Sequence, residues 1–274
     1  MPPKLGIVAG GGTLPAHLAR ACLNAGRDVF IVALKGHADP EAIGDLPHAW
    51  VRLGAAGKAI ELLREREVEE IVLAGDVRRP SLRELKPDLR AARFAAKGFL
   101  KRGDDGLLGA VVKALEEEEG FRVLGIQELM GGLLVREGDL AQSSPNERDL
   151  ADIGRGVAIL DSLAASDVGQ AIAVQDGVVL GIEAVEGTDA LIQRCATLRR
   201  DGRGPVLVKL PKRGQEKRID LPTIGPATID AASKAGFVGV AVAAGETLIV
   251  DADVTMTKAD EGGLFLHGLS RDTA

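Results

Sequence analysis

A run of three consecutive glycines limits what the start of this chain can form. The apolar residues 5–9 stop at Gly10, Gly11 and Gly12, after which apolar side chains recur at helical spacing over residues 14–22. A buried strand, a glycine turn and an amphipathic helix in this order are typical of a parallel α/β sheet. The missing side chains let backbone N–H groups and the helix N-terminus approach an anion closely, although a tight turn without a ligand needs the same glycines.

Strands and helices continue to alternate up to residue 125. The apolar periodicity predicts strands over residues 28–34, 68–74 and 121–125, and helices over residues 57–67, 90–100 and 105–119. This alternation predicts a Rossmann-like domain with a parallel sheet, in which ligands bind beyond the carboxyl ends of the strands. The glycine turn and Asp76, which follows the strand at 68–74, should therefore share one rim of the sheet.

The pattern loosens after Met130, and the small polar residues 143–146 are typical of a crossover between domains. We therefore predict a first domain over residues 1–135, a linker over 136–148 and an α+β domain over 149–274. Asp176 and Gly177 lie between two apolar runs, which predicts a hairpin over residues 170–183. The remaining pattern predicts helices over residues 149–163, 188–198 and 223–235, a strand over 206–210, and a hairpin-like pair at 238–242 and 247–250.

The composition excludes several classes of protein. A chain of 274 residues with 46% hydrophobic and 27% charged residues is typical of a soluble globular protein with room for two domains. A net charge of −6 and an aromatic content of 3% argue against a nucleic-acid platform, which needs a basic surface and stacking aromatics. The sequence has neither a signal-peptide pattern nor an apolar run of the roughly 20 residues that span a membrane, so we expect a cytoplasmic protein.

The cysteines and histidines indicate which metals the chain could bind. Cys22 and Cys195 each lie in an amphipathic helical pattern, which predicts buried reduced thiols. The four histidines lack the spacing of metal ligands. A metal would therefore be held by oxygen atoms, which favours magnesium or manganese over zinc.

Carboxylates stand at the start of two predicted helices. Asp104 and Asp105 can hold a divalent cation through their oxygen atoms, whereas an aspartate in this position is also a common helix cap. Asp189 follows Thr188 at the start of another helix, and the threonine alone would be interpreted as a cap. Both pairs are candidates for a metal site.

Cationic side chains follow the predicted strand at 206–210. Lys209 and Lys212 come first, and Asp220 follows a further basic pair. Cations that neutralise phosphates, beside a carboxylate that binds metal or activates water, are the groups that phosphoryl transfer needs. A solvated basic loop is the alternative interpretation.

A basic amphipathic stretch over residues 93–102 has two interpretations. Its apolar side chains, Phe94 and Phe99 among them, are interleaved with lysines and arginines. The stretch either packs its apolar side into the core or receives acyl chains and rests on an anionic membrane surface.

Five stretches, in chain order, resemble the UDP-2,3-diacylglucosamine pyrophosphatases of the LpxI kind, which act in lipid A synthesis. They are residues 5–15, 74–76 with 79–80, 103–105, 186–189 and 220–225, and they span nearly the whole chain. The resemblance implies hydrolysis of UDP-2,3-diacylglucosamine to UMP and 2,3-diacylglucosamine 1-phosphate, called lipid X, by water that attacks the β-phosphorus. It further implies assistance by Mg²⁺ or Mn²⁺ and an active site in a cleft between the two domains.

The resemblance also assigns residues and partners. Asp220 is implied to be catalytic, either as a metal ligand or as the group that activates water. Contact with the cytoplasmic face of the inner membrane and a homodimer are implied as well. The substrate-binding residues expected are Gly10, Gly11, Gly12, Leu14, Thr188, Lys209, Lys212, Thr223 and Ile224, and the expected metal ligands are Asp104, Asp105 and Asp189.

Two other functions are considered. The glycine turn is shared with nicotinamide-dependent oxidoreductases, but its spacing is not G-x-G-x-x-G, and no acidic residue stands in a clean ribose-binding position after the second strand. A lipid- or nucleotide-binding protein that holds a product without turnover is the non-enzymatic alternative.

Overall fold

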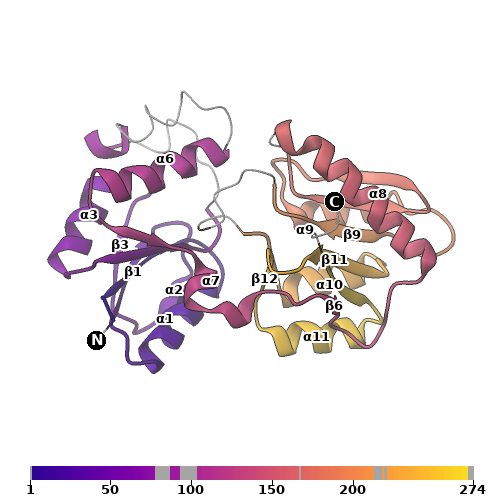
Figure 1. Ribbon diagram of the computed structural model, residues 1–274, viewed down its shortest axis with the longest axis horizontal. Helices are drawn as coiled ribbons and strands as arrows, with labels where there is room; N and C mark the ends of the chain where they lie inside the picture. Colours follow the sequence, from indigo (N-terminus) through magenta and orange to yellow (C-terminus); the bar gives the residue numbers. More distant parts are fainter. Residues whose placement is uncertain are drawn as a thin grey trace. The chain divides into compact units, whose positions relative to one another are not determined.

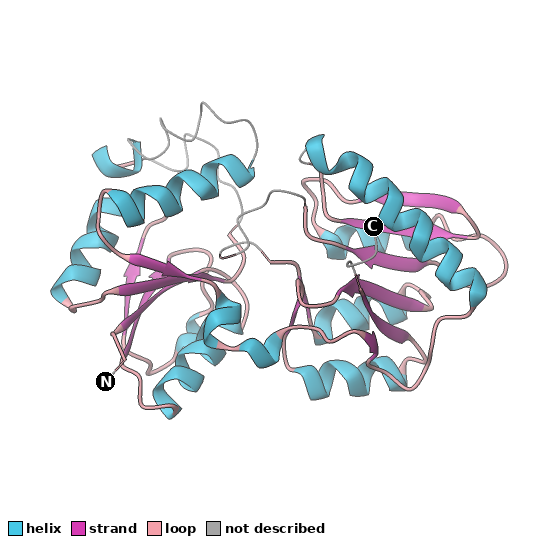
Figure 2. Ribbon diagram, in the orientation of Figure 1, coloured by secondary structure: helices cyan, strands magenta, loops and turns pink. Residues whose placement is uncertain are grey.

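The protein is described by a computed structural model that divides into two compact units (Figures 1 and 2). Unit 1 comprises residues 1–131 and 216–219, and unit 2 comprises residues 132–215 and 220–274. The structure describes residues 2–77, 87–92, 104–166, 168–212, 218 and 221–270, without the side chains of residues 104–107 and 165. Each unit has its own sheet and its own core, and each is considered by itself.

Unit 1 contains a five-stranded parallel sheet in the order β3-β2-β1-β4-β5. The order reverses between β1 and β4, which places their carboxyl ends side by side, as in Rossmann-like folds. This confirms the predicted parallel sheet. The strands are β1 (Leu5–Ala9), β2 (Val29–Leu34), β3 (His48–Val51), β4 (Glu70–Ala74) and β5 (Arg122–Leu124).

Helices cover both faces of this sheet. In Figure 1, α3 and α6 lie on one side of the strands and α1 lies on the other. Ile60 and Leu63 of α3 pack with Val112 of α6 into one apolar core, while Leu18 of α1 is fully buried on the opposite face. The helices are α1 (Leu14–Asn24), α2 (Pro40–Ile43), α3 (Ala56–Glu65), α6 (Asp104–Glu117) and α7 (Ile126–Leu129).

Unit 2 contains a six-stranded mixed sheet in the order β6-β13-β11-β9-β7-β8. The three central strands β13, β11 and β9 are parallel, and β7 runs antiparallel to β9. The carboxyl end of β9 therefore lies at the same edge as the start of β7. The strands are β6 (Gly138–Asp139), β7 (Ala171–Gln175), β8 (Val178–Ile182), β9 (Val206–Lys209), β11 (Gly239–Ala243) and β13 (Phe265–Leu269).

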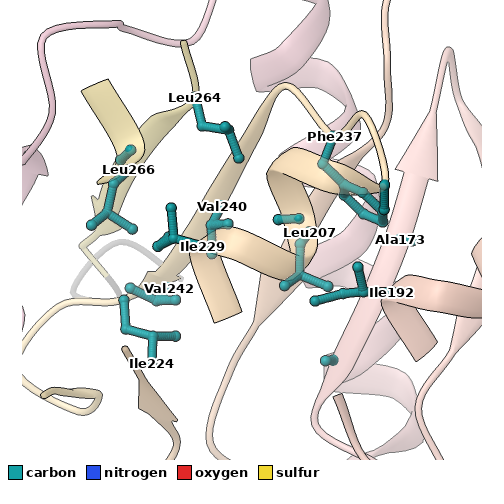
Figure 3. Close-up of a cluster of buried hydrophobic side chains, with 14 of the residues drawn as sticks. Ala173, Ile192, Leu207, Ile224, Ile229, Phe237, Val240, Val242, Leu264 and Leu266 are labelled. Carbon is teal, nitrogen blue, oxygen red and sulfur yellow. The ribbon is translucent and has the colours of Figure 1, made fainter. Parts of the chain in front are cut away.

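The two faces of this second sheet carry separate cores. Ile153 and Leu160 of α8 pack on one face, and helices α9, α10 and α11 cover the other. Figure 3 shows the second of these cores, in which strand residues such as Leu207 and Val240 lie with Ile229 of α10. The helices are α8 (Glu147–Leu163), α9 (Thr188–Ala196), α10 (Pro226–Lys234) and α11 (Ala252–Glu261), with short 3-10 turns at Gly131–Leu133 and Ala164–Ser166.

The hairpin predicted over residues 170–183 is confirmed. β7 and β8 are antiparallel, and Asp176 and Gly177 between them have φ values of 48° and 73°. Positive φ at both central residues is what a two-residue turn of this twist requires, and glycine reaches it without strain.

The hairpin-like pair predicted at 238–242 and 247–250 is wrong. β11 pairs with β9 and β13, whereas β12 (Leu248–Ile249) pairs with β10 (Thr223–Ile224) in a separate parallel ladder. β11 lies inside the sheet with both edges occupied, so β12 has no edge of β11 to join. Sequence proximity and a turn were therefore not enough to specify the pairing.

The helix predicted over residues 223–235 begins too early. Thr223 and Ile224 form β10, and α10 starts only at Pro226 after the N-cap residue Gly225. Proline is favoured in the first turn because its missing N–H would be unsatisfied there in any case. Two of the expected substrate-binding residues therefore lie on a strand rather than on a helix.

Several other elements were not predicted. The edge strands β3 and β6 and the helix–strand pair α11–β13 carry no clear periodicity, and β6 falls inside the segment interpreted as a linker. The basic stretch 93–102 lies outside the described residues. Over the part of the chain that is described, no helix combines the length and the apolar character needed to span a membrane.

The interpretation of both cysteines as buried thiols is confirmed. Cys22 in α1 and Cys195 in α9 are buried and free of disulfides. Burial raises the pKa of both thiols, which keeps them in the protonated form.

Candidate functional site

The glycine turn of unit 1 packs directly against the loop after β4. The Gly10 amide donates to the Ala74 carbonyl at 2.8 Å, and the Gly11 amide donates to the Asp76 carbonyl at 2.7 Å. Two of the three amides that could face an anion are therefore bonded within the fold. The third glycine, Gly12, is exposed ahead of α1, where the N-cap residue Thr13 makes no side-chain capping bond.

Close approach of backbone atoms explains why glycine stands at position 10 of the turn and at position 75 of the facing loop. A Cβ atom at Gly10 would lie 2.5 Å from the Asp76 carbonyl oxygen, and one at Gly75 would lie 2.3 Å from the Gly11 carbonyl oxygen. Only glycine permits contacts this short. The turn is therefore shaped by packing at the point where the strand order reverses, and Leu14 behind it is buried at 8% exposure.

The residues after β2 do not supply a ribose-binding carboxylate. Lys35, Gly36 and His37 follow the strand directly. Asp39, the first acidic residue after them, is the N-cap of α2 and accepts from the amides of Glu41 and Ala42 at 2.9 and 3.4 Å. No observation in this region favours a nicotinamide cofactor.

Three of the expected site residues cannot be compared with the structure. Asp104 and Asp105 form the start of α6, but their side chains lie outside the description. Asp220 lies entirely outside the described residues. Their roles as metal ligands and as the catalytic group stay predictions.

The rim of the sheet in unit 2 carries Lys209, one of the expected substrate-binding residues. Lys209 ends β9 and lies opposite Ala171 of β7, whose carbonyl accepts the Glu183 amide at 2.8 Å. Paired residues of neighbouring strands project to the same face of a sheet. Lys209 and Glu183 thus flank Ala171 on the face that α9 and α10 cover.

Lys209 is a buried cation with 8% exposure. Its Nζ atom donates to the Thr223 carbonyl at 3.0 Å. This bond joins the carboxyl end of β9 to β10, so the fold brings together two residues that lie 14 positions apart in the sequence. Ile224 is 1% exposed within the apolar core, and its carbonyl accepts the Val250 amide at 2.9 Å, so the described structure does not present it to a ligand. Lys212 is half-buried three residues beyond Lys209.

Thr188 is held by a buried carboxylate. Its Oγ1 atom donates to Glu183 Oε1 at 2.7 Å, and the other carboxylate oxygen accepts a hydrogen bond from the Gln170 backbone N–H at 2.8 Å. Glu183 is only 6% exposed. Sequence reasoning did not select Glu183, although an acidic residue that ends an apolar strand could have indicated it.

The N-terminus of α9 differs from the capping interpretation of Thr188. The N-cap residue is Gly187, with φ of 81° and no side-chain cap, and Thr188 is the first helical residue. The Thr188 hydroxyl bonds to Glu183 instead of to an amide of the first turn. Asp189 in the same turn is exposed, and its negative charge interacts favourably with the positive end of the helix dipole.

The described part of the chain contains no group of three or more histidine, cysteine, aspartate or glutamate side chains that could hold a metal ion. Asp189 is the one expected metal ligand whose side chain is described. A metal site made of three or more such side chains would therefore need residues outside the description.

Family models match both parts of the chain. The model of the LpxI N-terminal domain matches residues 4–133, and the model of the LpxI C-terminal domain matches residues 136–267. The chain belongs to the LpxI family. A relative from Caulobacter vibrioides, UDP-2,3-diacylglucosamine pyrophosphatase LpxI, is 39% identical over 97% of this chain and 97% of its own length.

Two solved structures of other proteins show only weak similarity to this chain. Glycinamide-RNase-transformylase T from Mycobacterium tuberculosis is 13% identical over 66% of this chain and 43% of its own, with a TM-score of 0.25. The biotin carboxylase domain of 2-oxoglutarate carboxylase from Hydrogenobacter thermophilus is 12% identical over 72% of this chain and 42% of its own, with a TM-score of 0.26. At these scores neither structure bears on the fold or the function.

Proposed function

We propose that this chain hydrolyses the pyrophosphate bond of UDP-2,3-diacylglucosamine and releases UMP and 2,3-diacylglucosamine 1-phosphate. The observation that carries the proposal is the 39% identity to a UDP-2,3-diacylglucosamine pyrophosphatase over 97% of both chains. A match that covers both domains favours transfer of the whole reaction rather than of a nucleotide-binding fold alone.

In this proposal the chain's own residues orient and neutralise the pyrophosphate. Attack by water places negative charge on the bridging oxygen, and a cation held in a dry site stabilises that charge. The buried Lys209 ammonium, anchored on the Thr223 carbonyl, is suited to this role. Asp220 is proposed to act on the attacking water or to bind the metal.

Mg²⁺ or Mn²⁺ is part of the proposal. A divalent ion would neutralise phosphate oxygens and lower the barrier to attack. Asp104, Asp105 and Asp189 are the proposed ligands. The described residues do not by themselves assemble a set of three such ligands.

The decisive experiment incubates the purified chain with UDP-2,3-diacylglucosamine and MgCl₂ in ¹⁸O-labelled water and identifies the products by mass spectrometry. We expect UMP without label and 2,3-diacylglucosamine 1-phosphate with one ¹⁸O atom, because attack on the β-phosphorus leaves the label on the lipid. Tight binding of the substrate without UMP release would support the non-catalytic alternative, and a change of NADH fluorescence on mixing would support the oxidoreductase.

Two variants then test the assigned residues. Asp220→Ala should lower kcat by about 10²-fold or more, the scale of a lost acid–base or metal-binding group. Lys209→Met should lower kcat/KM by about 10²-fold, as for a lost electrostatic contact to the transition state. Near wild-type turnover of either variant would remove that residue from the mechanism.

Membrane contact belongs to the proposal because the substrate is a lipid, and a homodimer belongs to it because the family resemblance implies one. Co-sedimentation with vesicles that contain anionic lipid tests the first, and light scattering of the eluted protein tests the second. A monomer that stays in the supernatant would contradict both.

A further inference from the structure

The bond between Thr188 and Glu183 determines what the threonine can offer to a ligand. A hydroxyl has one proton to donate, whereas a carboxylate can only accept. The 2.7 Å contact between Thr188 Oγ1 and Glu183 Oε1 therefore uses the hydroxyl proton. Thr188 keeps its lone pairs, so toward any further partner it is an acceptor.

Glu183 cannot turn away to release this proton. Its second carboxylate oxygen accepts the Gln170 amide, and its own amide donates to the Ala171 carbonyl. Gly169 packs so closely that a Cβ atom there would lie 2.1 Å from the Glu183 carbonyl oxygen. The backbone of residues 169–171 thus holds Glu183 in place, and the Gln170 N–H orients its carboxylate and, through it, the Thr188 hydroxyl.

We propose that Thr188 accepts a hydrogen bond from an uncharged donor of the ligand, a sugar hydroxyl or an amide N–H, and that Glu183 is the positioning residue that sets this polarity. The proposal rests on the proposed function, whose acylated glucosamine carries both kinds of donor. An ionised phosphate offers only acceptors, so it is a poor partner for Thr188. Among the described residues, no group of three or more acidic, imidazole or thiol side chains that could hold a metal ion includes Glu183.

The variant Glu183→Gln reverses the polarity of Thr188 with the least change of shape. The Gln170 backbone N–H can only donate, so the oxygen of the new side-chain amide must face it. The new NH₂ group must then face Thr188 Oγ1 and donate to it. The threonine proton is displaced toward the ligand, and Thr188 changes from an acceptor to a donor while every buried group keeps a partner.

The main experiment measures KM and kcat for UDP-2,3-diacylglucosamine. We expect Glu183→Gln to raise KM about tenfold and to change kcat by less than about threefold. The rise in KM is the scale of one lost hydrogen bond, because the Thr188 hydroxyl and the donor of the ligand would then face each other. Thr188→Val should raise KM to a similar extent, and Thr188→Ser should stay near the wild type because it keeps the oxygen. A lower KM in Glu183→Gln, or an unchanged KM in Thr188→Val, would overturn the proposal.

A binding experiment separates this inference from the proposed function. UDP-N-acetylglucosamine keeps the amide N–H and the 4- and 6-hydroxyls of the substrate, with an acetyl group in place of the long N-acyl chain and a free 3-hydroxyl, and UDP lacks the sugar. We expect Glu183→Gln to weaken binding of the first about tenfold and to leave binding of UDP unchanged. If the wild type releases no UMP but Glu183→Gln shows this selective loss of binding, the proposed function fails and the role of Thr188 stands. If UMP is released and the two nucleotides respond alike, the reverse holds.

A fold control accompanies both measurements. Glu183→Gln and Thr188→Ser should unfold within about 2 °C of the wild type, since no buried group loses its partner. If Glu183→Gln is unstable, the pair Thr188→Ser and Thr188→Val still decides whether the oxygen atom accepts a bond.

Discussion

Two fully buried threonines in unit 2 show how the contribution of a buried hydroxyl to stability depends on its hydrogen-bond partner. Thr255 Oγ1 donates to the Val250 carbonyl at 2.7 Å. Thr247 is equally buried, but its Oγ1 atom has no hydrogen-bond partner in the described part of the chain. A buried hydroxyl without a partner costs about 1–3 kcal/mol.

Replacing each threonine with valine should therefore change stability in opposite directions. We expect Thr247→Val to raise the free energy of unfolding by about 1 kcal/mol and Thr255→Val to lower it by about 1 kcal/mol. Urea unfolding followed by circular dichroism measures both. Equal effects of the two substitutions would show that the environment of Thr247 is not as described.

Asp139 of β6 makes two side-chain bonds, one to His267 of β13 and one to Ser144 in the loop before α8. Its carboxylate accepts from Ser144 Oγ at 2.6 Å and contacts His267 Nδ1 on the other side. The Ser144 bond, followed by the His267 bond, lowers the pKa of Asp139 below its ordinary value of 3.8. The charged form of this aspartate is thus stabilised by the native contacts.

A lowered pKa gives a stabilisation that is complete above the unfolded pKa and disappears as the pH falls through the folded value. We expect the wild type to be more stable than Asp139→Asn above about pH 5, with the difference shrinking as the pH falls below about 4. Urea midpoints between pH 3 and 7 measure the effect. A difference that grows on acidification would have the wrong sign.

At the scale of elements, α8 holds the β7–β8 hairpin through one carboxylate. Asp152 accepts from the amides of Asp176 and Gly177 at 2.8 and 2.6 Å, and it is 6% exposed. Both turn residues have positive φ. The helix therefore satisfies the two backbone donors that the tight turn leaves unpaired.

Asp152→Ala should lower the free energy of unfolding by about 2–3 kcal/mol, because two part-buried hydrogen bonds to a charged acceptor are lost. Arg155→Ala, at an exposed position of the same helix, is the matched control and should cost less than about 0.5 kcal/mol. Hydrogen exchange of the Asp176 and Gly177 amides should quicken in Asp152→Ala alone. Unchanged protection would contradict the assigned role.

The loops after β1 and β4 provide a second test. Gly12 and Gly75 both have positive φ, of 78° and 88°, but only Gly75 packs against backbone atoms. Gly12→Ala should cost about 1 kcal/mol for strain alone. Gly75→Ala should cost at least about 2 kcal/mol more, because its Cβ would meet the Gly11 carbonyl oxygen. Similar thermal midpoints for the two variants would argue against the close contact.

At the scale of the molecule, each unit is held by its own aliphatic core and not by an identified metal site in its described residues. Removal of divalent ions should therefore affect activity and leave the fold intact. We expect EDTA to abolish UMP release and to shift the unfolding midpoint by less than about 2 °C, with Mg²⁺ or Mn²⁺ restoring activity. Full activity after exhaustive chelation would contradict the proposed metal requirement.

The amino-acid sequence determined the elements whose signals are local. The apolar runs at residues 5–9 and 68–74 and the glycines at 10–12 indicated the parallel sheet, and Asp176 with Gly177 indicated the hairpin. Such signals depend on the period of apolar residues and on the φ values that glycine allows, which are properties of a few neighbouring residues.

Tertiary structure alone decided which distant residues meet. The pairing of β12 with β10 and the bond from Lys209 to the Thr223 carbonyl join segments that are separated in the sequence. The position of Glu183 beside Ala171 likewise depends on the pairing of β8 with β7. Strand order depends on which edges are already occupied, and no short stretch of sequence records that. For the same reason, Thr188 looked like a helix cap in the sequence, whereas the folded chain directs its proton to Glu183.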